Sequence, residues 1–357
     1  MQLRLAEERD REGLSDLWVT CFPGDEAFRD YFLKEVFEPR NAFVYADGDR
    51  IVSMAHILPM EIDYHSNVVP AGYIFAVGTD PEYRGRGLAA RVLEQIFAEL
   101  RHRNIPLAIL VPQKDSLFEY YKRFGFAEVF GLTTVKLRRE GIPDDKISDR
   151  YTLVRSSLTA GRLDTVPTAG DISDANRMFE NVMRYRNHLL RTDLHWERAV
   201  RIAEIAGGGM FLLKDGGTLM GYAVCEITDD GLLINELFAE DEESYHTLCA
   251  KVLDEFRTNR ADMLTPACPH DAERFGMARI LDAKTMLSYA ASYRKDMNFE
   301  IVVSDRTCPW NSGKYRVEGP EVGFAEQIES RAHITPGQLS EVLFGAGPIP
   351  YVNLLFS

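Results

Sequence analysis

The sequence predicts a mixed α/β (α+β) fold that is divided among several domains, and three observations support this. Strand-like and helix-like patterns of hydrophobic residues alternate along the whole chain. The order of these patterns in the first part of the chain recurs in the middle part. The chain has 357 residues, 45% of them hydrophobic, which is enough for two or three packed cores. We therefore expect domains at 1–140, 150–278 and 279–357.

The elements of the first domain follow from local patterns. A short strand, two helices and two strands around the turn Asp47-Gly48-Asp49 are expected at Leu3–Leu5, Glu12–Cys21, Ala27–Phe37, Asn41–Ala46 and Arg50–Leu58. A strand, a helix, a strand, a helical run and a last strand are expected at Tyr73–Gly78, Ala90–Leu100, Pro106–Pro112, Ser116–Phe126 and Thr133–Leu137.

The most informative segment is the turn that joins the strand at 73–78 to the helix at 90–100. Gly85 and Gly87 have no Cβ atom, so an anion can approach the backbone N–H groups closely there. A helix N-terminus attracts anions, and Arg84 and Arg86 add positive charge. This combination of residues predicts a turn that binds a pyrophosphate.

Three interpretations of this turn are open. The spacing Gly85-x-Gly87-x-x-Ala90 matches a dinucleotide-binding pattern, which requires an acidic residue about 20 positions later, at the end of the next strand. That strand, 106–112, has no acid at its end. An ordinary helix start with basic residues is the second alternative. The third is a coenzyme A site, because the turn resembles the Arg-x-x-Gly-x-Ala turn of the GNAT (Gcn5-related N-acetyltransferase) superfamily.

This resemblance extends to the run Tyr121 to Phe126, which is similar to the Tyr-x-x-x-Gly-Phe segment near the end of a GNAT fold. The resemblance implies that acetyl-CoA is the co-substrate. It also implies a set of cofactor-binding residues on the fourth strand and the turn: Val77, Thr79, Arg84, Gly85, Arg86, Gly87, Leu88 and Ala89. The backbone N–H of Val77 would polarise the thioester carbonyl.

Tyr121 is the expected catalytic proton donor to the departing thiolate. A phenol has a pKa near ~10, so it carries a proton at neutral pH. The neighbouring Tyr120 points about 100° away on the helix, so only one of the two can face the sulfur. The match to the family favours Tyr121, and the alternative is that Tyr121 only packs in the core.

The second domain repeats the order of the first. A helix at Ala169–Leu190, strands at Met210–Lys214, Leu219–Ile227 and Leu232–Phe238, and a helix at Ser244–Arg257 are expected. The turn between the last strand and helix contains Glu240-Asp241-Glu242-Glu243 and no glycine, so it would repel a pyrophosphate. We expect a GNAT-like copy without cofactor binding; an unrelated α/β domain is the alternative.

The third segment carries motifs that look like those of a sterol-carrier-protein-type domain: Arg279 to Asp282, the turn Pro309-x-Asn311-x-Gly313-x-Tyr315, and the run Leu339 to Gly345. Two GNAT folds in tandem followed by such a domain resemble the enhanced intracellular survival (Eis) family, bacterial acetyltransferases known for modifying aminoglycosides. The resemblance implies self-association as hexamers and a C-terminal main-chain carboxylate as the general base, which here would belong to Ser357. A tail that is merely docked is the alternative.

The acceptor amine is expected beside the first two helices. Asp25 and Glu26 would attract a cation and Phe28 could stack on a ring; the alternative is that the two acids only stabilise a helix start. The net charge of −14 fits a cationic small molecule of aminoglycoside or polyamine type and argues against nucleic acid. A protein or peptide amine as acceptor, or an apolar ligand held by the third domain, is the alternative function.

Composition limits the other possibilities. The five cysteines include no Cys-x-x-Cys pair, and the eight histidines lack the spacing of metal ligands, so no metal is expected. No segment has the length and apolarity of a membrane span or a signal peptide. A cytoplasmic enzyme without a membrane or nucleic-acid partner is therefore expected.

Overall fold

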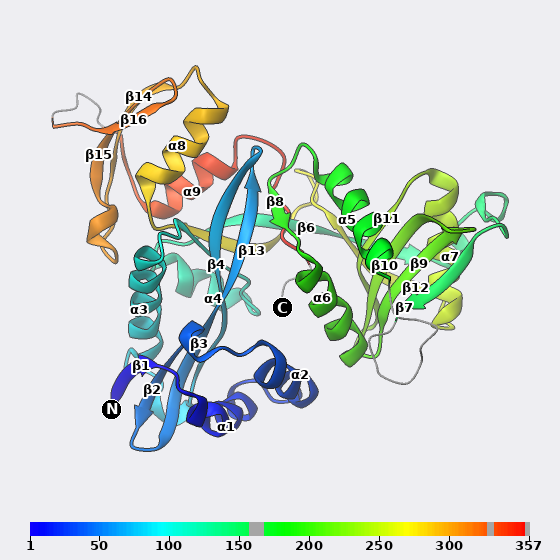
Figure 1. Ribbon diagram of the computed structural model, residues 1–357, viewed down its shortest axis with the longest axis horizontal. Helices are drawn as coiled ribbons and strands as arrows, with labels where there is room; N and C mark the ends of the chain where they lie inside the picture. The colour runs from blue at the N-terminus through cyan, green and yellow to red at the C-terminus, as the bar shows by residue number, and fades with distance from the viewer. Residues whose placement is uncertain (157–167, 327–331, 354–357) are drawn as a thin grey trace. The chain divides into compact units, whose positions relative to one another are not determined.

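The computed structural model describes residues 1–156, 168–326 and 332–353 (Figure 1). Residue contacts divide the chain into two compact units. Unit 1 comprises Met1–Phe130 and Phe275–Gly347, and unit 2 comprises Gly131–Arg274 and Pro348–Ser357. Each unit therefore combines two separate stretches of the chain. The three domain ranges drawn from the sequence stay a prediction.

Unit 1 contains one large mixed sheet and four helices in its N-terminal stretch. The strands, in spatial order, are β1 (Gln2–Leu5), β2 (Ala42–Asp47), β3 (Arg50–Tyr64), β4 (Asn67–Thr79), β5 (Leu107–Leu110) and β13 (Glu273–Ile280). Neighbouring strands are antiparallel except β4 and β5, which are parallel. The helices are α1 (Arg11–Cys21), α2 (Glu26–Tyr31), α3 (Leu88–His102) and α4 (Asp115–Lys122), and a π-helical turn, Phe32–Val36, follows α2.

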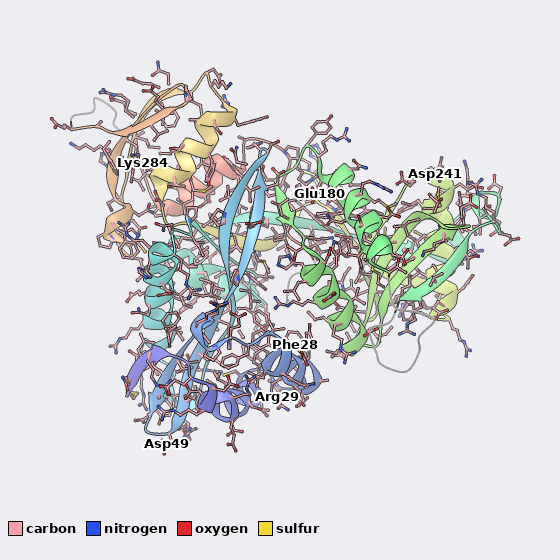
Figure 2. The ribbon with its side chains drawn as sticks, in the orientation of Figure 1. Phe28, Arg29, Asp49, Glu180, Asp241 and Lys284 are labelled. Atoms are coloured by element: carbon pink, nitrogen blue, oxygen red, sulfur yellow. The ribbon has the colours of Figure 1, made fainter. Side chains whose placement is uncertain are left out.

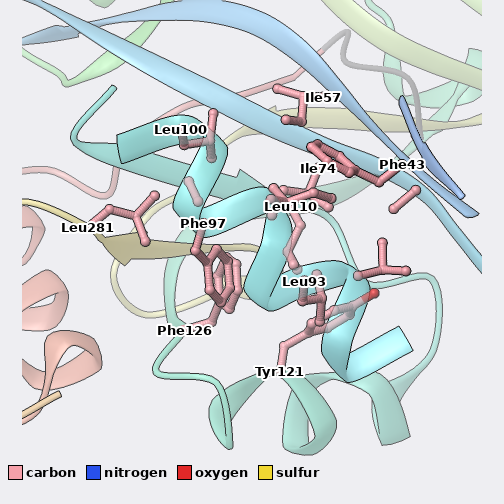
Figure 3. Packing of buried hydrophobic residues seen from close by; sticks show 14 of the residues in the cluster. Phe43, Ile57, Ile74, Leu93, Phe97, Leu100, Leu110, Tyr121, Phe126 and Leu281 are labelled. Carbon is pink, nitrogen blue, oxygen red and sulfur yellow. The ribbon is translucent and has the colours of Figure 1, made fainter. Parts of the chain in front are cut away.

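The face of α3 that the sequence predicts to be apolar is buried in the core of unit 1 (Figure 3). Val92, Leu93, Ile96, Phe97 and Leu100 are all fully buried, at the three- and four-residue spacing of one helix face. Burying a side chain of this size contributes roughly 1.5–3 kcal/mol. This packing holds the N-terminus of α3 in place beside the end of β4.

The hairpin β3–β4 is longer than the sequence predicts. The two strands run on to a turn at His65 and Ser66, both of which have positive φ angles, 49° and 67°. Hairpin turns of this kind normally carry Asn or Gly. His65 and Ser66 are not such a pair, so the sequence did not indicate a hairpin turn at this position. The two strands were therefore expected to be shorter than they are.

The expected last strand of the first domain is present as β6 (Ala127–Arg138), but residues 131–138 of this strand lie in unit 2 and not in unit 1. Its residues Leu132–Arg138 pair with β12 (Arg260–Pro266) within unit 2. In unit 1 the strand next to β5 is β13, through Met277–Ile280. Periodicity shows that a segment is a strand but not which strand it pairs with. The pairing of β6 with β12, and of β13 with β5, was therefore not predictable.

The second stretch of unit 1 forms a smaller α+β part. Its sheet has the spatial order β16 (Glu321–Phe324), β15 (Gly313–Glu318), β14 (Asn298–Val303) and β17 (His333–Ile334). Its helices are α8 (Ala283–Tyr293) and α9 (Pro336–Phe344). The expected N-cap of the last helix is confirmed, because the Thr335 side chain accepts a hydrogen bond from the Gln338 N–H, with Pro336 in the first turn.

Unit 2 has a sheet with the same alternation of strands and helices. Its strands, in spatial order, are β7 (Thr152–Ser156), β9 (Gly209–Asp215), β10 (Thr218–Thr228), β11 (Gly231–Ala239), β12 and the C-terminal part of β6. Only β11 and β12 are parallel, as β4 and β5 are in unit 1. The helices are α5 (Ala169–Met183), α6 (Asp193–Ile205) and α7 (Glu242–Glu255).

One expectation for unit 2 was wrong. The helix expected at 169–190 ends at Met183, and the segment His188–Leu190 is a strand, β8. Helix α6, at 193–205, was not expected at all. No Gly or Pro lies between Met183 and His188, so the usual signal for the end of a helix is missing.

Candidate active site

The turn at 84–89 has the geometry of an anion site. Gly85 and Gly87 adopt φ angles of 76° and 75°, which favour glycine, and a Cβ atom on either would meet nothing within 4 Å. The glycines are therefore required by the backbone conformation and leave open space in front of it. Gly87 is the N-cap of α3 and has no side chain to satisfy the first N–H groups of the helix. These donors are available to an anionic ligand.

The two arginines of the turn are exposed, and backbone carbonyls hold each of them. Arg84 donates from Nε to the Thr79 carbonyl oxygen at 3.1 Å, and Arg86 donates to the Glu82 carbonyl oxygen at 3.0 Å. The Arg86 guanidinium also lies over the Tyr83 ring, 4.7 Å from its centroid. Two positive charges are thus placed on either side of Gly85, next to the N-terminus of α3.

A β-bulge lies in β4 just before the turn, and no sequence signal predicted it. The register passes from Met54↔Gly78 to His56↔Phe75, so Ala76 and Val77 together face a single residue of β3. Ala76 has a φ of 49°, an uncommon value for a residue other than glycine. The bulge turns the backbone of Val77 away from the regular ladder. The register of β4 with β5 covers only Ala71 to Tyr73.

Tyr121 and Tyr120 have different surroundings, as their helix spacing predicts. Tyr121 is 6% exposed and packs in the core around α3, and Tyr120 is only partly buried (Figure 3). Burial raises the pKa of the Tyr121 phenol above its ordinary value, so the group stays protonated at neutral pH. Among the described residues, no group hydrogen-bonds to its hydroxyl, which leaves that proton free for a ligand.

The chain after α4 is fixed by a buried ion pair of unit 1. Arg279 is fully buried and donates to both carboxylate oxygens of Asp305, at 2.8 and 2.7 Å. Its guanidinium lies so close to Gly125 (φ 80°) that a Cβ atom there would clash with it. The Asn311 amide donates to Asp305 and to the Ile280 carbonyl. The motifs around Arg279 and Asn311 in the sequence are therefore parts of one buried polar cluster.

The predicted acceptor residues lie on or beside α2. Figure 2 labels Phe28 on α2. Its ring belongs to a group of aromatic rings, with its centroid 5.9 Å from that of Trp18 and 6.0 Å from that of Phe75. Asp25 and Glu26 are exposed at the start of the same helix, and Asp25 makes no capping hydrogen bond with its side chain. Partial burial, followed by the charge of Glu26, raises the pKa of Asp25.

The sequence did not point to Phe75 or His56, which belong to the same group of rings as Phe28. Phe75 precedes the bulge of β4, and His56 faces it across the ladder. His56 is buried, and desolvation lowers its pKa to about 3, so its ring is neutral at physiological pH. Neither its Nε2 nor the Trp18 Nε1 has a hydrogen-bond partner within the described part of the chain. The available signal was the four-residue spacing of aromatic residues within two pairs, 18 with 22 and 28 with 32.

In the corresponding turn of unit 2, a side chain of the turn itself caps the N-terminus of the following helix. Asp241 is the N-cap of α7, and its carboxylate accepts from the Ser244 N–H at 2.7 Å (Figure 2). Hydrogen bonds from Ser244 lower the pKa of Asp241, so the carboxylate is charged. Glu242 and Glu243 add negative charge to the first turn. A second anion would be repelled here, in contrast to the turn in unit 1.

Three further findings concern the other expected features. Among the described residues, no cluster of three or more His, Cys, Asp or Glu could hold a metal ion. No helix within the described ranges has both the length and the hydropathy needed to cross a membrane. Ser357, the expected source of the catalytic base, lies outside the described residues, and its role stays a prediction.

Comparisons with known proteins agree with this geometry. Residues 2–129 match the family model of an acetyltransferase (GNAT) domain. The chain is 28% identical over 156 residues to the N-alpha-acetyltransferase RimI of Mycobacterium tuberculosis, a match that covers 42% of this chain and 87% of that relative.

Two solved structures resemble the chain over nearly its full length. One is a GCN5-related N-acetyltransferase from Anabaena variabilis, with a TM-score of 0.73, 17% identity and coverage of 99% of this chain and 100% of the other. The second is Eis1 from Mycobacterium abscessus, with a TM-score of 0.70, 14% identity and coverage of 97% and 90%. These similarities show that the chain has the fold of these acetyltransferase structures. Residues 2–129 thus match a GNAT acetyltransferase domain, and this domain includes the turn before α3.

Proposed function

We propose that the protein transfers an acetyl group from acetyl-CoA to a primary amine, and that the chemistry takes place in unit 1. The observation that carries the proposal is the uncapped N-terminus of α3, preceded by two left-handed glycines and flanked by Arg84 and Arg86. This arrangement suits a pyrophosphate, and it stands directly after the bulged end of β4. Residues Thr79, Gly85, Leu88 and Ala89 complete the proposed coenzyme site.

Residues of unit 1 would supply two of the three requirements of acetyl transfer. Acetyl-CoA would bring an activated thioester. The Val77 N–H would polarise its carbonyl, and Tyr121 would give a proton to the thiolate when the acceptor nitrogen bonds to the acetyl carbon and the C–S bond breaks. The raised pKa of Tyr121 keeps that proton in place before the reaction. The third requirement, a base for the amine, is the predicted role of Ser357.

The acceptor that we favour is a cationic small molecule of aminoglycoside or polyamine type. Asp25 and Glu26 place two exposed acids at the start of α2, and Phe28 follows in the same turn. Replacing both acids by Asp25→Asn and Glu26→Gln should raise the KM for a polycationic amine and leave the KM for acetyl-CoA unchanged. The control is Asp30→Asn, which removes an exposed acid of the same helix that is paired with Arg29.

A peptide amine is the second candidate, because the curated relative with 28% identity is an N-alpha-acetyltransferase. Acetyl-CoA turnover should be measured with polyamines, aminoglycosides, lysine peptides and peptides with free N-termini in parallel. Acetylation of the polycations at a kcat/KM at least 10-fold above that of the peptides supports our choice, and the reverse order assigns the peptide amine.

A lipid-binding role is the third alternative, and it rests on the sterol-carrier-like motifs of the third segment. A thermal shift with acetyl-CoA against one with a fatty acyl ligand separates it from the acetyltransferase proposal. Stabilisation by the fatty ligand alone would favour the binding protein. The hexameric assembly implied by the Eis-like motifs also stays a prediction, which sedimentation of the full chain would test.

A further inference from the structure

The chain segment that follows unit 1 is built into the fold of unit 2 as an extended strand. The Tyr351 N–H donates to the Asn187 carbonyl oxygen at 2.8 Å, and the Leu189 N–H donates to the Tyr351 carbonyl oxygen at 3.1 Å. His188 and Tyr351 form a parallel β-bridge. The Arg186 guanidinium also donates to the Ile349 carbonyl oxygen, at 2.5 Å. Residues 349–353, which we call the tail strand, thus lie beside β8 and bind through main-chain hydrogen bonds, as an added peptide strand does.

Two side chains of the tail strand enter fully buried positions. Tyr351 is 0% exposed, and its hydroxyl donates to Glu236 at 2.8 Å. The Asn353 amide donates to the Asn235 carbonyl oxygen and to the Tyr351 hydroxyl. The tail strand therefore has two anchors, an aromatic hydroxyl and an amide two residues later. Neither anchor is charged.

The receiving site is largely complete without the tail strand. Arg191 donates to the two carboxylate oxygens of Glu236 at 2.7 and 2.8 Å, and the Tyr222 hydroxyl donates at 2.7 Å. The Arg191 guanidinium stacks on Phe179 of α5 at 3.6 Å. Thus three of the four hydrogen bonds to the buried Glu236 carboxylate come from Arg191 and Tyr222, and only the fourth comes from Tyr351 of the tail strand. A buried charge pair that is satisfied in this way can persist when the ligand leaves.

The site lies at the bulge of β11, the strand that leads into α7. The register passes from Val224↔Glu236 to Cys225↔Ile234, so Asn235 has no opposite residue. Both buried anchors of the tail strand bind at this point. In unit 1 the corresponding strand, β4, is also bulged, and there the rings of α1 and α2 gather beside Phe75. By element order, α5 and α6 are the counterparts of α1 and α2.

We infer that unit 2 is a receptor for an extended peptide strand that bears a tyrosine and, two residues later, an asparagine, and that the tail strand of the same chain is its resident ligand. In unit 2 the Asp241 carboxylate occupies the helix N-terminus that would otherwise bind a coenzyme. Unit 2 nevertheless has a binding site at the bulge of β11, and the bulge of β4 in unit 1 adjoins the proposed site of the acceptor amine. The function of unit 2 is recognition of peptide backbone, tyrosine hydroxyl and asparagine amide.

The test uses a chain that ends at Gly347 and a fluorescently labelled peptide with the sequence of residues 348–353. We expect saturable binding to one site per chain. Peptides with Tyr351→Phe or Asn353→Ala should bind at least 10-fold more weakly, because each change removes a buried hydrogen bond between the peptide and the receptor. All these changes are in the peptide, so the fold of the receptor is the same in every arm. Equal binding of the altered, scrambled and native peptides would overturn the inference.

A second measurement on the full chain covers the case in which the shortened chain does not fold. Hydrogen exchange of the Tyr351 and Leu189 amides should be slow, because each donates within the bridge between the tail strand and β8. The change Asn353→Ala should accelerate both amides by a similar factor, at least 10-fold, and leave the amides of β9 and β10 unchanged. Fast exchange in the unaltered chain, or acceleration of only one of the two amides, contradicts a docked strand that can be released.

Discussion

Tyr121 is the side chain on which the proposed chemistry depends most. Its side chain is buried in the core around α3, and its hydroxyl has no hydrogen-bond partner among the described residues; burial raises the pKa of this phenol. Tyr121→Phe should lower kcat about 10²-fold and leave the affinity for acetyl-CoA near that of the unaltered protein, because a proton donor acts only in the transition state. Steady-state kinetics and calorimetric titration measure the two quantities.

Tyr120→Phe is the matched control, because Tyr120 adjoins Tyr121 and is only partly buried. It should change kcat by less than about 3-fold. The ordinary pKa of a tyrosine phenol is near ~10. Because burial raises the pKa of Tyr121, this phenol keeps its proton at still higher pH. Between pH 6 and 9 the profile of kcat should therefore show no loss of rate from this group. Equal effects of the two substitutions would contradict the assignment.

Gly87 is the second position at which we expect a single substitution to have a large effect, here on the binding of acetyl-CoA. A glutamate there would place a negative charge in front of the first N–H groups of α3, and acetyl-CoA binding should be lost. Gly48→Glu is the control, since Gly48 also has a positive φ, 63° against 75°, and also has open space around it. Both changes strain the backbone alike, so only the charge at the proposed site differs. Loss of binding in both variants would mean that strain was the cause.

At the scale of elements, the pair Arg279–Asp305 holds β13, the turn at Gly125 and the start of α8 together within unit 1. Arg279→Met leaves a buried carboxylate without its cation, and should lower the free energy of unfolding by about 3–5 kcal/mol. Denaturant unfolding followed by tryptophan fluorescence measures this. The exposed pair of Arg316 with Glu300 is the control, and Arg316→Met should cost no more than about 1 kcal/mol. Similar costs for the two changes would contradict the structural role given to Arg279.

Elements with strong periodicity were predictable, and their pairings were not. Helix α3 and the turn before it followed from the spacing of apolar residues and from two glycines. The bulge at Ala76 could not be predicted from the sequence, because an alanine does not indicate a positive φ angle. The exchange by which β6 pairs with β12, and β13 with β5, depends on contacts between distant segments. The buried cluster around Arg279 could be recognised only as a set of motifs, without its geometry.

For the whole molecule, the contrast between the turn of unit 1 and the corresponding turn of unit 2 predicts one coenzyme site per chain. The N-terminus of α3 in unit 1 is uncapped, and that of α7 in unit 2 is capped by the carboxylate of Asp241. Isothermal titration of the full chain with acetyl-CoA should give a stoichiometry of one. Asp241→Asn should leave both stoichiometry and affinity unchanged. Two equivalents of acetyl-CoA per chain would show that unit 2 binds the coenzyme after all.

The proposed transfer of an acetyl group from acetyl-CoA to an amine by unit 1 gives two products, coenzyme A and an acetylated amine. Release of coenzyme A should be followed together with the mass of an acetylated polyamine or aminoglycoside, for the unaltered chain and for Gly87→Glu. We predict one acetylated amine for each coenzyme A released, and loss of both products in the variant. A Gly87→Glu chain that acetylates the amine at the rate of the unaltered protein would contradict it.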